Sequence, residues 1–235
     1  MGTKAARWVL VPGTLCDGSV FDPLMAALDV PELQRLVLPQ DLSNIEGWRT
    51  RLAGTVKPGD IVCGFSLGAI AVAHSADLLD EARALVLIAL NPDADAPEKR
   101  EGREGLRRAA KNGEIEHMFH AAAPALFARP TPALIEAVTR MAQAEARHID
   151  AQTDLALSRP GALPALSRAR LPVVFVTGAD DKQAPPSLAT EAALRTPRAA
   201  LSVPHGLGHF CLLEDPACMA TEIAKGLQEL GVSSC

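Results

Sequence analysis

The sequence predicts an α/β fold, with a doubly wound parallel sheet of about six strands and a helical insert. The first observation behind this prediction is a series of short apolar runs that alternate with segments of helical spacing, a pattern typical of a parallel sheet with helices on both faces. The second is a change between residues 95 and 159, where helix-like segments rich in Ala, Arg and Glu follow one another without a strand. The third is the pentapeptide Gly-Phe-Ser-Leu-Gly at residues 64–68, where a strand-like run meets a helix-like run.

Each expected strand is a short, mostly apolar run next to a turn-forming residue. The runs cover residues 8–11, 33–38, 61–64, 84–90, 171–177 and 199–203. Continuous apolar runs of this length suit strands that are buried on both faces of a sheet. Between them, residues 19–28 and 45–56 have helical spacing, and Ser19 is placed to act as the N-terminal capping residue of the first of these helices.

The predicted insert contains three helices, over residues 98–111, 114–126 and 132–157. Because the chain leaves one core strand and returns to another, we expect a core of residues 1–94 and 160–235 and a cap of residues 95–159. The cap is expected over the carboxyl edge of the sheet, where the pentapeptide also lies. The alternative is a helical layer against the side of the core, away from any site.

Composition and charge exclude several classes of function. The chain has 235 residues, 48% of them hydrophobic, and a formal net charge of −5 with acidic and basic residues mixed along its length. This length suits one domain with a full core, and the charge argues against nucleic acid as a partner. The apolar run at residues 8–11 is too short for a signal-peptide core or a membrane span, so no membrane is expected.

The cysteines indicate reduced thiols. They form an odd set without a Cys-x-x-Cys pair and without zinc-like spacing to the histidines, and they are Cys16, Cys63, Cys211, Cys218 and Cys235. Neither a disulfide framework nor a metal site is expected, and this cysteine usage indicates a cytoplasmic setting.

The pentapeptide around Ser66 has the pattern of a nucleophile elbow. A strand that turns into a helix within one or two residues forces Ser66 into a strained conformation, and Gly64 and Gly68 keep side chains out of the tight turn. The amide of Leu67 would then lie in the first turn of a helix, where it can stabilise an oxyanion. A simpler interpretation is a Gly/Ser turn between two core elements.

Two further motifs follow the pentapeptide in an informative order. Val-Val-Phe-Val-Thr-Gly-Ala-Asp-Asp begins at Val173, and Gly-His-Phe-Cys-Leu-Leu-Glu-Asp-Pro begins at Gly208. With these motifs the chain resembles the α/β-hydrolase family, whose members carry Ser, Asp and His in this order. Only seven residues precede Trp8, so the strand pair with which family members usually begin is expected to be absent. The resemblance implies six parallel strands in the order 2-1-3-4-5-6, with the site at the switch point between strands 1 and 3.

The resemblance also implies a catalytic triad of Ser66, Asp181 and His209. His209 follows a glycine in a loop after the last strand, which is the family position of the base, and His205 is the nearest rival. The other histidines, which we interpret as structural, are His74, His117, His120 and His148. In a triad His209 would remove the Ser66 proton while the acid holds the imidazole in one tautomer.

The acid is assigned by spacing. The family pattern places it three residues after a glycine and four before a proline, and Gly178 and Pro185 satisfy this for Asp181. The alternatives are Asp180, which is its neighbour, and Asp93, which follows the fourth expected strand.

The second oxyanion donor is expected in the loop after the first strand. Family members often have His-Gly-x there, and this chain has Pro12-Gly13-Thr14, so the resemblance implies the backbone amide of Thr14 as the donor. A simple turn is the alternative. Cys16 lies nearby and is expected either to line the pocket or to fill the core as a small buried residue.

A basic stripe runs along the first insert helix; it consists of Arg100, Arg103, Arg107 and Lys111. A solvated face is expected, because acidic residues that can pair with the stripe are interleaved with it, namely Glu98, Glu101 and Glu104. The alternative is a docking surface for an anionic acyl carrier, such as a carrier protein or coenzyme A. The apolar insert residues at helical spacing are expected first of all to form the core of the cap, and they could also face a substrate in an apolar pocket; they are Met118, Phe119, Leu126, Phe127 and Met141.

These features together predict a cytoplasmic serine hydrolase that cleaves a carboxylic ester or thioester through an acyl-enzyme on Ser66, without a metal or organic cofactor. The expected partner is a small-molecule acyl substrate, and the chain is expected to be a monomer or a homodimer. One alternative is an acyltransferase or lyase that uses the same residues. Another is a non-catalytic small-molecule receptor, against which an intact set of Ser, His and Asp argues.

Overall fold

The computed structural model describes residues 6–232 and contains one parallel sheet of six strands. The strand order is β2-β1-β3-β4-β5-β6, and every neighbouring pair is parallel. The strands are β1 (Trp8–Val11), β2 (Arg35–Val37), β3 (Ile61–Phe65), β4 (Ala84–Ile88), β5 (Val173–Val176) and β6 (Ala199–Ser202). The expected fold class and strand order are confirmed.

Side chains of the central strands alternate between two apolar layers. Along β1, Trp8 and Leu10 belong to the layer on one face of the sheet, whereas Val9 and Val11 belong to the layer on the other. Every residue of β1, β3 and β4 is buried, as expected for strands that helices cover on both faces. The register pairs Val11 with Gly64, so the loops that follow β1 and β3 begin side by side.

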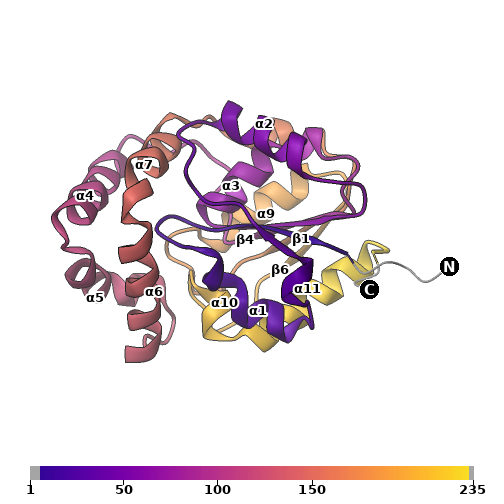
Figure 1. The fold of residues 1–235 in the computed structure, drawn as a ribbon. Coiled ribbons are helices and arrows are strands. Elements are labelled where there is room, and N and C mark those ends of the chain that lie inside the picture. Colours follow the sequence, from indigo (N-terminus) through magenta and orange to yellow (C-terminus); the bar gives the residue numbers. More distant parts are fainter. Residues whose placement is uncertain (1–5, 233–235) are drawn as a thin grey trace.

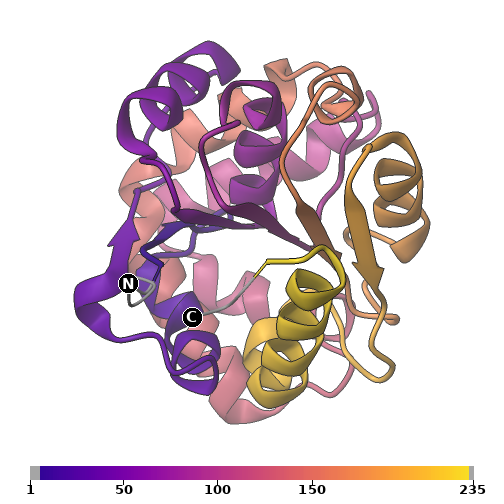
Figure 2. The same cartoon turned by 90° about the vertical axis from the view of Figure 1, so that its right-hand side faces the viewer.

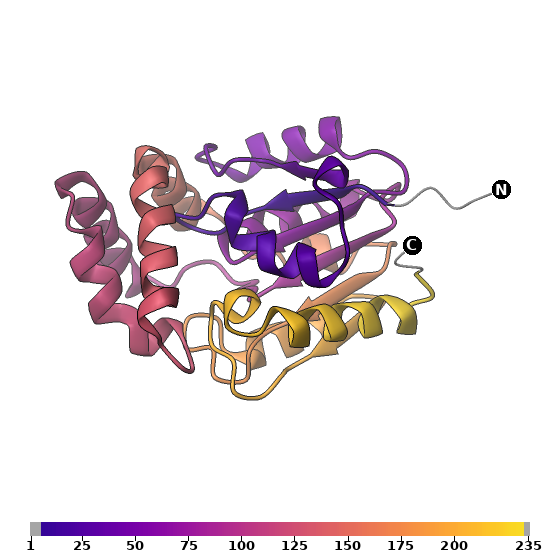
Figure 3. The ribbon, with the colours of Figure 1, turned by 60° about the horizontal axis from the view of Figure 1, so that its bottom comes forward.

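Helices cover both faces of the sheet. The helices on one face are α1 (Asp22–Ala27), α10 (Cys211–Glu214) and α11 (Pro216–Glu229) (Figure 3). Those on the other face are α2 (Ile45–Thr55), α3 (Leu67–His74), α8 (Leu163–Leu166) and α9 (Pro186–Arg195) (Figure 2). All residues of α3 are buried, because small and branched apolar side chains surround this helix on every side.

Four consecutive helices lie together beyond one end of the sheet, and we call them the cap helices (Figure 1). They are α4 (Lys99–Asn112), α5 (Ile115–Leu126), α6 (Pro132–Glu145) and α7 (Ile149–Ser158). α4 packs on both α5 and α7, and α5 packs on α6. The expected division of the chain into a core (1–94 and 160–235) and a cap (95–159) stays a prediction.

Two local expectations near the start of the chain are wrong. The second strand is shorter than the expected 33–38, because Glu32–Gln34 form a 3-10 helix before β2 begins. Ser19 does not cap the first helix. A 3-10 helix, Gly18–Phe21, precedes α1 instead, and Asp17 caps this 3-10 helix, since its carboxylate accepts a hydrogen bond from the Ser19 amide at 2.8 Å.

The expected single helix over residues 132–157 is two helices. α6 ends at Glu145, and a 3-10 helix, Ala146–His148, redirects the chain into α7. No proline or glycine marks this break in the sequence. The break is a tertiary effect, because it lets α7 pack along α4 and brings Gln152 to the loop after β1.

The solvated face expected for the basic stripe is found at Arg100 and Lys111, which are exposed, but not at Arg103 and Arg107. Arg103 contacts the buried carboxylate of Asp95 at 2.8 Å, and Arg107 contacts Asp150 of α7 at 3.5 Å. Among the interleaved glutamates, Glu104 pairs with Arg107 at 3.4 Å. The side chains of Arg103 and Arg107 are only 25% and 21% exposed, because α4 turns them toward these carboxylates. Docking of an acyl carrier on the stripe stays a prediction.

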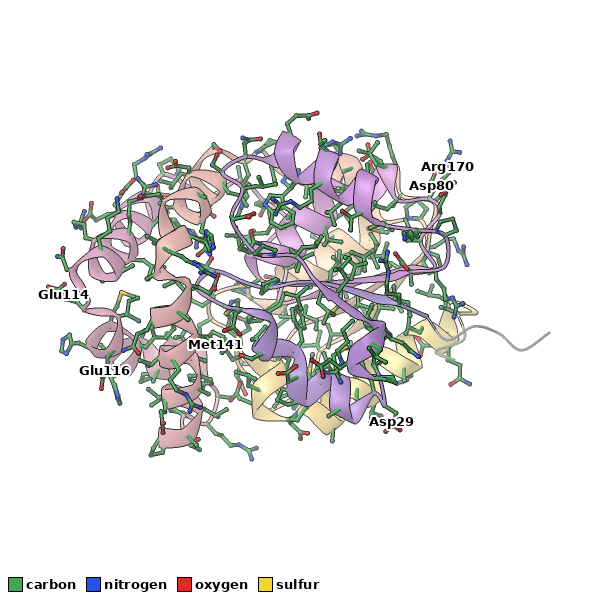
Figure 4. The ribbon with its side chains drawn as sticks, viewed as in Figure 1. Asp29, Asp80, Glu114, Glu116, Met141 and Arg170 are labelled. Atoms are coloured by element: carbon green, nitrogen blue, oxygen red, sulfur yellow. The ribbon has the colours of Figure 1, made fainter. Side chains whose placement is uncertain are left out.

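Within residues 6–232, no helix is long and apolar enough to cross a membrane. Figure 4 shows Glu114 and Glu116 on the outer edge of the cap helices, whereas Asp80 and Arg170 lie at the opposite end, 4.0 Å apart. The cysteines at 16, 63, 211 and 218 are free thiols, and Cys235 lies outside the described residues.

Candidate active site

Ser66 stands on the sharp turn between β3 and α3. Its backbone has φ 52° and ψ −115°, a conformation that costs a residue other than glycine about 1–3 kcal/mol. A Cβ at Gly64 would lie 2.6 Å from the Cα of Ala69, and one at Gly68 would collide with the carbonyl oxygen of Val11. Both positions require glycine, because α3 approaches β3 and β1 so closely.

Three side chains form a hydrogen-bonded chain at this turn. The Oγ of Ser66 lies 3.0 Å from Nε2 of His209, and Nδ1 of His209 lies 2.9 Å from Oδ2 of Asp181. Asp181 and His209 are buried, with 3% and 7% of their surface exposed. When the N–H of Nδ1 donates a hydrogen bond to the carboxylate, Nε2 is free to accept the proton of the serine hydroxyl.

Asp181 is held by its own loop after β5. Its second oxygen, Oδ1, accepts hydrogen bonds from the amides of Gln183 and Ala184, both at 2.8 Å, which leaves Oδ2 for His209. A Cβ at Gly178 would collide with the backbone of the loop that carries His209. The glycine therefore lets the two loops approach each other closely enough for the carboxylate to reach the imidazole.

The alternative candidates lie away from this chain of hydrogen bonds. Asp180, Asp93 and His205 are exposed. Within the part of the chain that the structure describes, none of their side chains hydrogen-bonds to Ser66 or His209. The structure thus brings together the three residues that have the family spacing. The alternative candidates are not part of the hydrogen-bonded chain.

The loop that carries His209 is anchored to the end of α5. The amide of His209 donates to the Leu126 carbonyl at 2.9 Å. Glu214 provides a second anchor, since its Oε2 accepts from the Gly208 amide at 2.6 Å and its Oε1 accepts from the Ala128 amide at 2.8 Å. Sequence analysis missed this role of Glu214, although the residue belongs to the motif that begins at Gly208.

The loop after β1 approaches Ser66 from the other side. A Cβ at Gly13 would lie 3.1 Å from the Cβ of Ser66, and Thr14 and Leu67 line the cavity beside the serine. The amide of Leu67 is the first of α3, so it has no partner within that helix. The amides of Thr14 and Leu67 are therefore candidate donors to a negatively charged oxygen next to Ser66.

A cap helix holds the residue that follows Thr14. The Leu15 amide donates to Oε1 of Gln152 at 2.9 Å, and Nε2 of Gln152 donates to the Gln40 carbonyl at 3.2 Å. Gln152 is completely buried. The Leu15 amide is therefore not available to a negatively charged oxygen, because it already donates a hydrogen bond to Gln152. The Thr14 amide stays the expected donor of this loop. Sequence analysis did not single out Gln152, because a glutamine in an Ala-rich helical segment carries no local signal.

A cavity of about 390 Å³ opens next to Ser66 and His209. Apolar side chains of α4 and α5 form its roof, namely Leu106, Met118, Phe119, Ala122 and Leu126. Lys99 and Arg103 of α4 also line it. Phe127 and Met141 are buried in the core cluster, the first of the two roles expected for them, and do not line the cavity.

Three residues with a strained backbone conformation line this cavity. Leu15, Ser66 and Ala89 have φ of 55°, 52° and 53°, and all three line the cavity. They lie just beyond β1, β3 and β4. Residues other than glycine in this conformation are uncommon, and their clustering is typical of functional sites.

Other reactive side chains are less suited to chemistry. Burial raises the pKa of the thiols of Cys16, Cys63 and Cys211, so they stay protonated and are poor nucleophiles. Cys16 belongs to the core cluster and does not line the cavity. Among residues 6–232, no group of three or more His, Cys, Asp or Glu side chains could hold a metal ion.

The sequence matches the Alpha/beta hydrolase family over residues 8–218, and the chain belongs to this family. No curated protein matches the sequence.

Several solved structures share the fold. An esterase from Thermogutta terrifontis, solved with malate bound, has 20% identity and a TM-score of 0.73, with 98% of this chain and 92% of that one covered. The enol-lactonase from Burkholderia xenovorans LB400 has 16% identity and a TM-score of 0.79, with 96% and 92% covered. MenH from S. aureus has 14% identity and a TM-score of 0.80, with 98% and 96% covered. At these identities the likeness shows the fold alone.

Proposed function

We propose that this chain is a serine hydrolase that cleaves a carboxylic ester or thioester through an acyl-enzyme on Ser66. The observation that carries the proposal is the hydrogen-bonded chain from Asp181 through His209 to Ser66, with distances of 2.9 and 3.0 Å, at the wall of a largely apolar cavity. Such a chain activates a serine hydroxyl for attack on a carbonyl. Family membership and the fold shared with an esterase and an enol-lactonase support it, since a lactone is also an ester.

In the proposed first half, Nε2 of His209 takes the proton of Ser66 as Oγ attacks the substrate carbonyl. The negative charge moves onto the carbonyl oxygen, where the amides of Leu67 and Thr14 donate hydrogen bonds to it. Asp181 stabilises the imidazolium and keeps Nε2 directed at the serine. When the carbonyl re-forms, the alcohol or thiol leaves with the proton from His209, and the acyl group stays on Ser66.

In the second half, water replaces the alcohol or thiol. His209 takes a proton from the water as the water oxygen attacks the acyl carbon. His209 then returns that proton to Ser66 Oγ as the carboxylic acid is released. Neither half requires a metal or an organic cofactor. A second acceptor in place of water would make the same chemistry an acyl transfer, so product analysis with added alcohols distinguishes a hydrolase from a transferase.

The test of the proposal is the reaction of Ser66 with a fluorophosphonate probe. We expect intact-mass measurement to show one adduct on the wild type and on the control Ser187→Ala, whose serine is exposed on α9, and none on Ser66→Ala. Ester turnover by Ser66→Ala should fall by a factor of about 10⁶, as on removal of the nucleophile of a coupled triad. A panel of p-nitrophenyl esters and acyl-coenzyme A thioesters then separates ester from thioester preference. A wild type without an adduct, or an Ala variant with the same one, would contradict the proposal.

A further inference from the structure

The cavity beside Ser66 is apolar over most of its wall, but α4 adds two basic residues to it. Lys99 and Arg103 line it from neighbouring turns of α4, together with Asn91. Within the described residues, none of those that line the cavity is an aspartate or a glutamate. The cavity therefore carries positive charge that its own walls do not neutralise.

The charge of Arg103 is only partly balanced by its neighbour. The carboxylate of Asp95 is 1% exposed; it accepts from Nε of Arg103 at 2.8 Å and from Nη2 of Arg159 at 2.7 Å. Burial lowers the pKa of Arg159 to about 10, which is still well above neutral pH, so this guanidinium is charged. Arg103 and Arg159 thus share the carboxylate of Asp95, Asp93 also attracts Arg159, and Lys99 adds a further positive charge at the cavity.

Arg103 and Lys99 keep donors for a ligand. Nε and Nη2 of Arg103 face Asp95, whereas its Nη1 makes no hydrogen bond within the described residues. The ammonium of Lys99 forms no ion pair with the described residues, and the side chain is exposed. A guanidinium nitrogen and an ammonium on neighbouring helical turns suit the two oxygens of one carboxylate.

We propose that the substrate carries a carboxylate, which Lys99 and Arg103 bind while its ester or thioester group lies at Ser66. The inference rests on the proposed function, because it names the substrate class of the same site. Leu106 and Met118 line the same cavity and would contact the hydrocarbon that separates the two ends of the substrate. The carboxylate can belong to the acyl part or to the alcohol part of the ester, and the experiment distinguishes these two sources.

The test compares each anionic ester with its neutral counterpart. Monoethyl succinate, glutarate and adipate carry the carboxylate on the acyl part, and the diethyl esters are their neutral counterparts. Acetate esters of ω-hydroxy acids carry it on the alcohol part, and acetate esters of alkanols of equal length are the counterparts. We expect kcat/KM to favour the anionic members of one series by about ten- to a hundredfold, the range of a hydrogen bond to a charged group.

Variants locate the preference on α4. Arg103→Gln and Lys99→Gln should each remove most of it by raising KM for the anionic ester, and turnover of the neutral ester reports on folding. Arg100→Gln is the matched control, because Arg100 is exposed, follows Lys99 directly and does not line the cavity. Lys99→Glu, at an exposed position, is a second variant for the case that Arg103→Gln does not fold, and it should invert the preference.

The outcomes separate this inference from the proposed function. If neutral esters are turned over as well as anionic ones and Lys99→Glu does not change the ratio, the inference is overturned while the proposed function stands. If no ester is turned over and Ser66 is not labelled, the proposed function fails, and calorimetric binding of the same ester pairs to Ser66→Ala decides the inference alone. Tighter binding of the anionic member, lost in Ser66→Ala/Lys99→Glu, supports it. Equal binding of both members, or no binding, overturns it.

Discussion

The core and the cap helices contribute to the cavity in different ways. The core carries Ser66, Asp181 and His209, each in a turn or loop that follows a strand of the sheet. The cap helices contribute an apolar roof and the basic side chains of Lys99 and Arg103. The proposed reacting groups are thus placed by backbone that the sheet holds, whereas the groups that would contact the rest of the substrate lie on an inserted layer. In a fold that hosts many functions, such a division lets one chemistry serve different substrates.

Buried and partly buried hydrogen bonds join the two regions and the two ends of the cap. Gln152 of α7 holds the loop after β1, and Glu214 of α10 holds the end of α5. Arg159, just after α7, pairs with Asp95 just before α4, so the two ends of the cap helices are tied to each other. Leaving one such buried group without its partner costs about 1–3 kcal/mol. We expect these contacts to fix where the cap helices stand over Ser66.

After loss of the nucleophile itself, the largest expected effect lies in the core, at the acid. Asp181→Asn should lower kcat by a factor of about 10⁴, because an amide cannot accept from Nδ1 and stabilise the imidazolium as the carboxylate does. The matched control is Asp180→Asn, since Asp180 is its exposed neighbour and should lose little. Steady-state rates on the best ester of the panel provide the measurement. Similar losses in the two variants, or a larger loss in Asp93→Asn, would show that Asp181 is not the acid of the triad.

A smaller effect, on the free energy of unfolding, is expected at His74. This buried residue of α3 interacts electrostatically with Arg159. Burial, and after it the positive charge of Arg159, lowers the pKa of His74 from 6.5 to about 4. Between these values the unfolded chain binds a proton that the folded protein does not, so the free energy of unfolding falls as the pH falls through this window. The difference between the two pKa values corresponds to about 3 kcal/mol.

Urea unfolding at a series of pH values measures this effect. The free energy of unfolding of the wild type should fall between pH 6.5 and about 4. In His74→Leu this fall should be smaller by about 3 kcal/mol. His117→Leu is the control, because His117 is exposed and should keep the wild-type slope. Parallel curves for the wild type and His74→Leu would show that titration of His74 is not coupled to folding.

Local signals explain why the core could be predicted from the sequence. Apolar runs next to turn residues mark the strands, and the tight turn at Ser66 requires its two glycines. The proximity of Ser66, Asp181 and His209 follows from topology, because the carboxyl ends of parallel strands lie along one edge of a sheet. Their catalytic roles stay a proposal.

The contacts between core and cap could not be predicted in this way. Gln152 lies 137 residues from Leu15, and Arg159 lies 64 residues from Asp95. Nothing in the local pattern marks such residues, since packing of distant segments decides their partners. The basic stripe of α4 illustrates the same point: spacing predicts that Arg103 and Arg107 share a face, but not that buried or distant carboxylates lie against it.

The smallest expected effect on turnover lies where the cap helices reach the loop after β1. Gln152→Leu removes the acceptor for the Leu15 amide and with it one support of the neighbouring Thr14. We expect kcat to fall about tenfold with little change in KM, because the loss concerns the alignment of a donor that acts on the transition state and not on the bound substrate.

Gln152→Glu, protonated in this buried position, keeps an acceptor for Leu15 and a donor for the Gln40 carbonyl, so it should retain most of the rate. Thr139→Val, at a buried position on α6, controls for a general weakening of the cap helices. If Gln152→Leu instead raises KM and leaves kcat unchanged, Gln152 holds the cap helices in place without aligning the donor, and the cap would influence substrate binding alone.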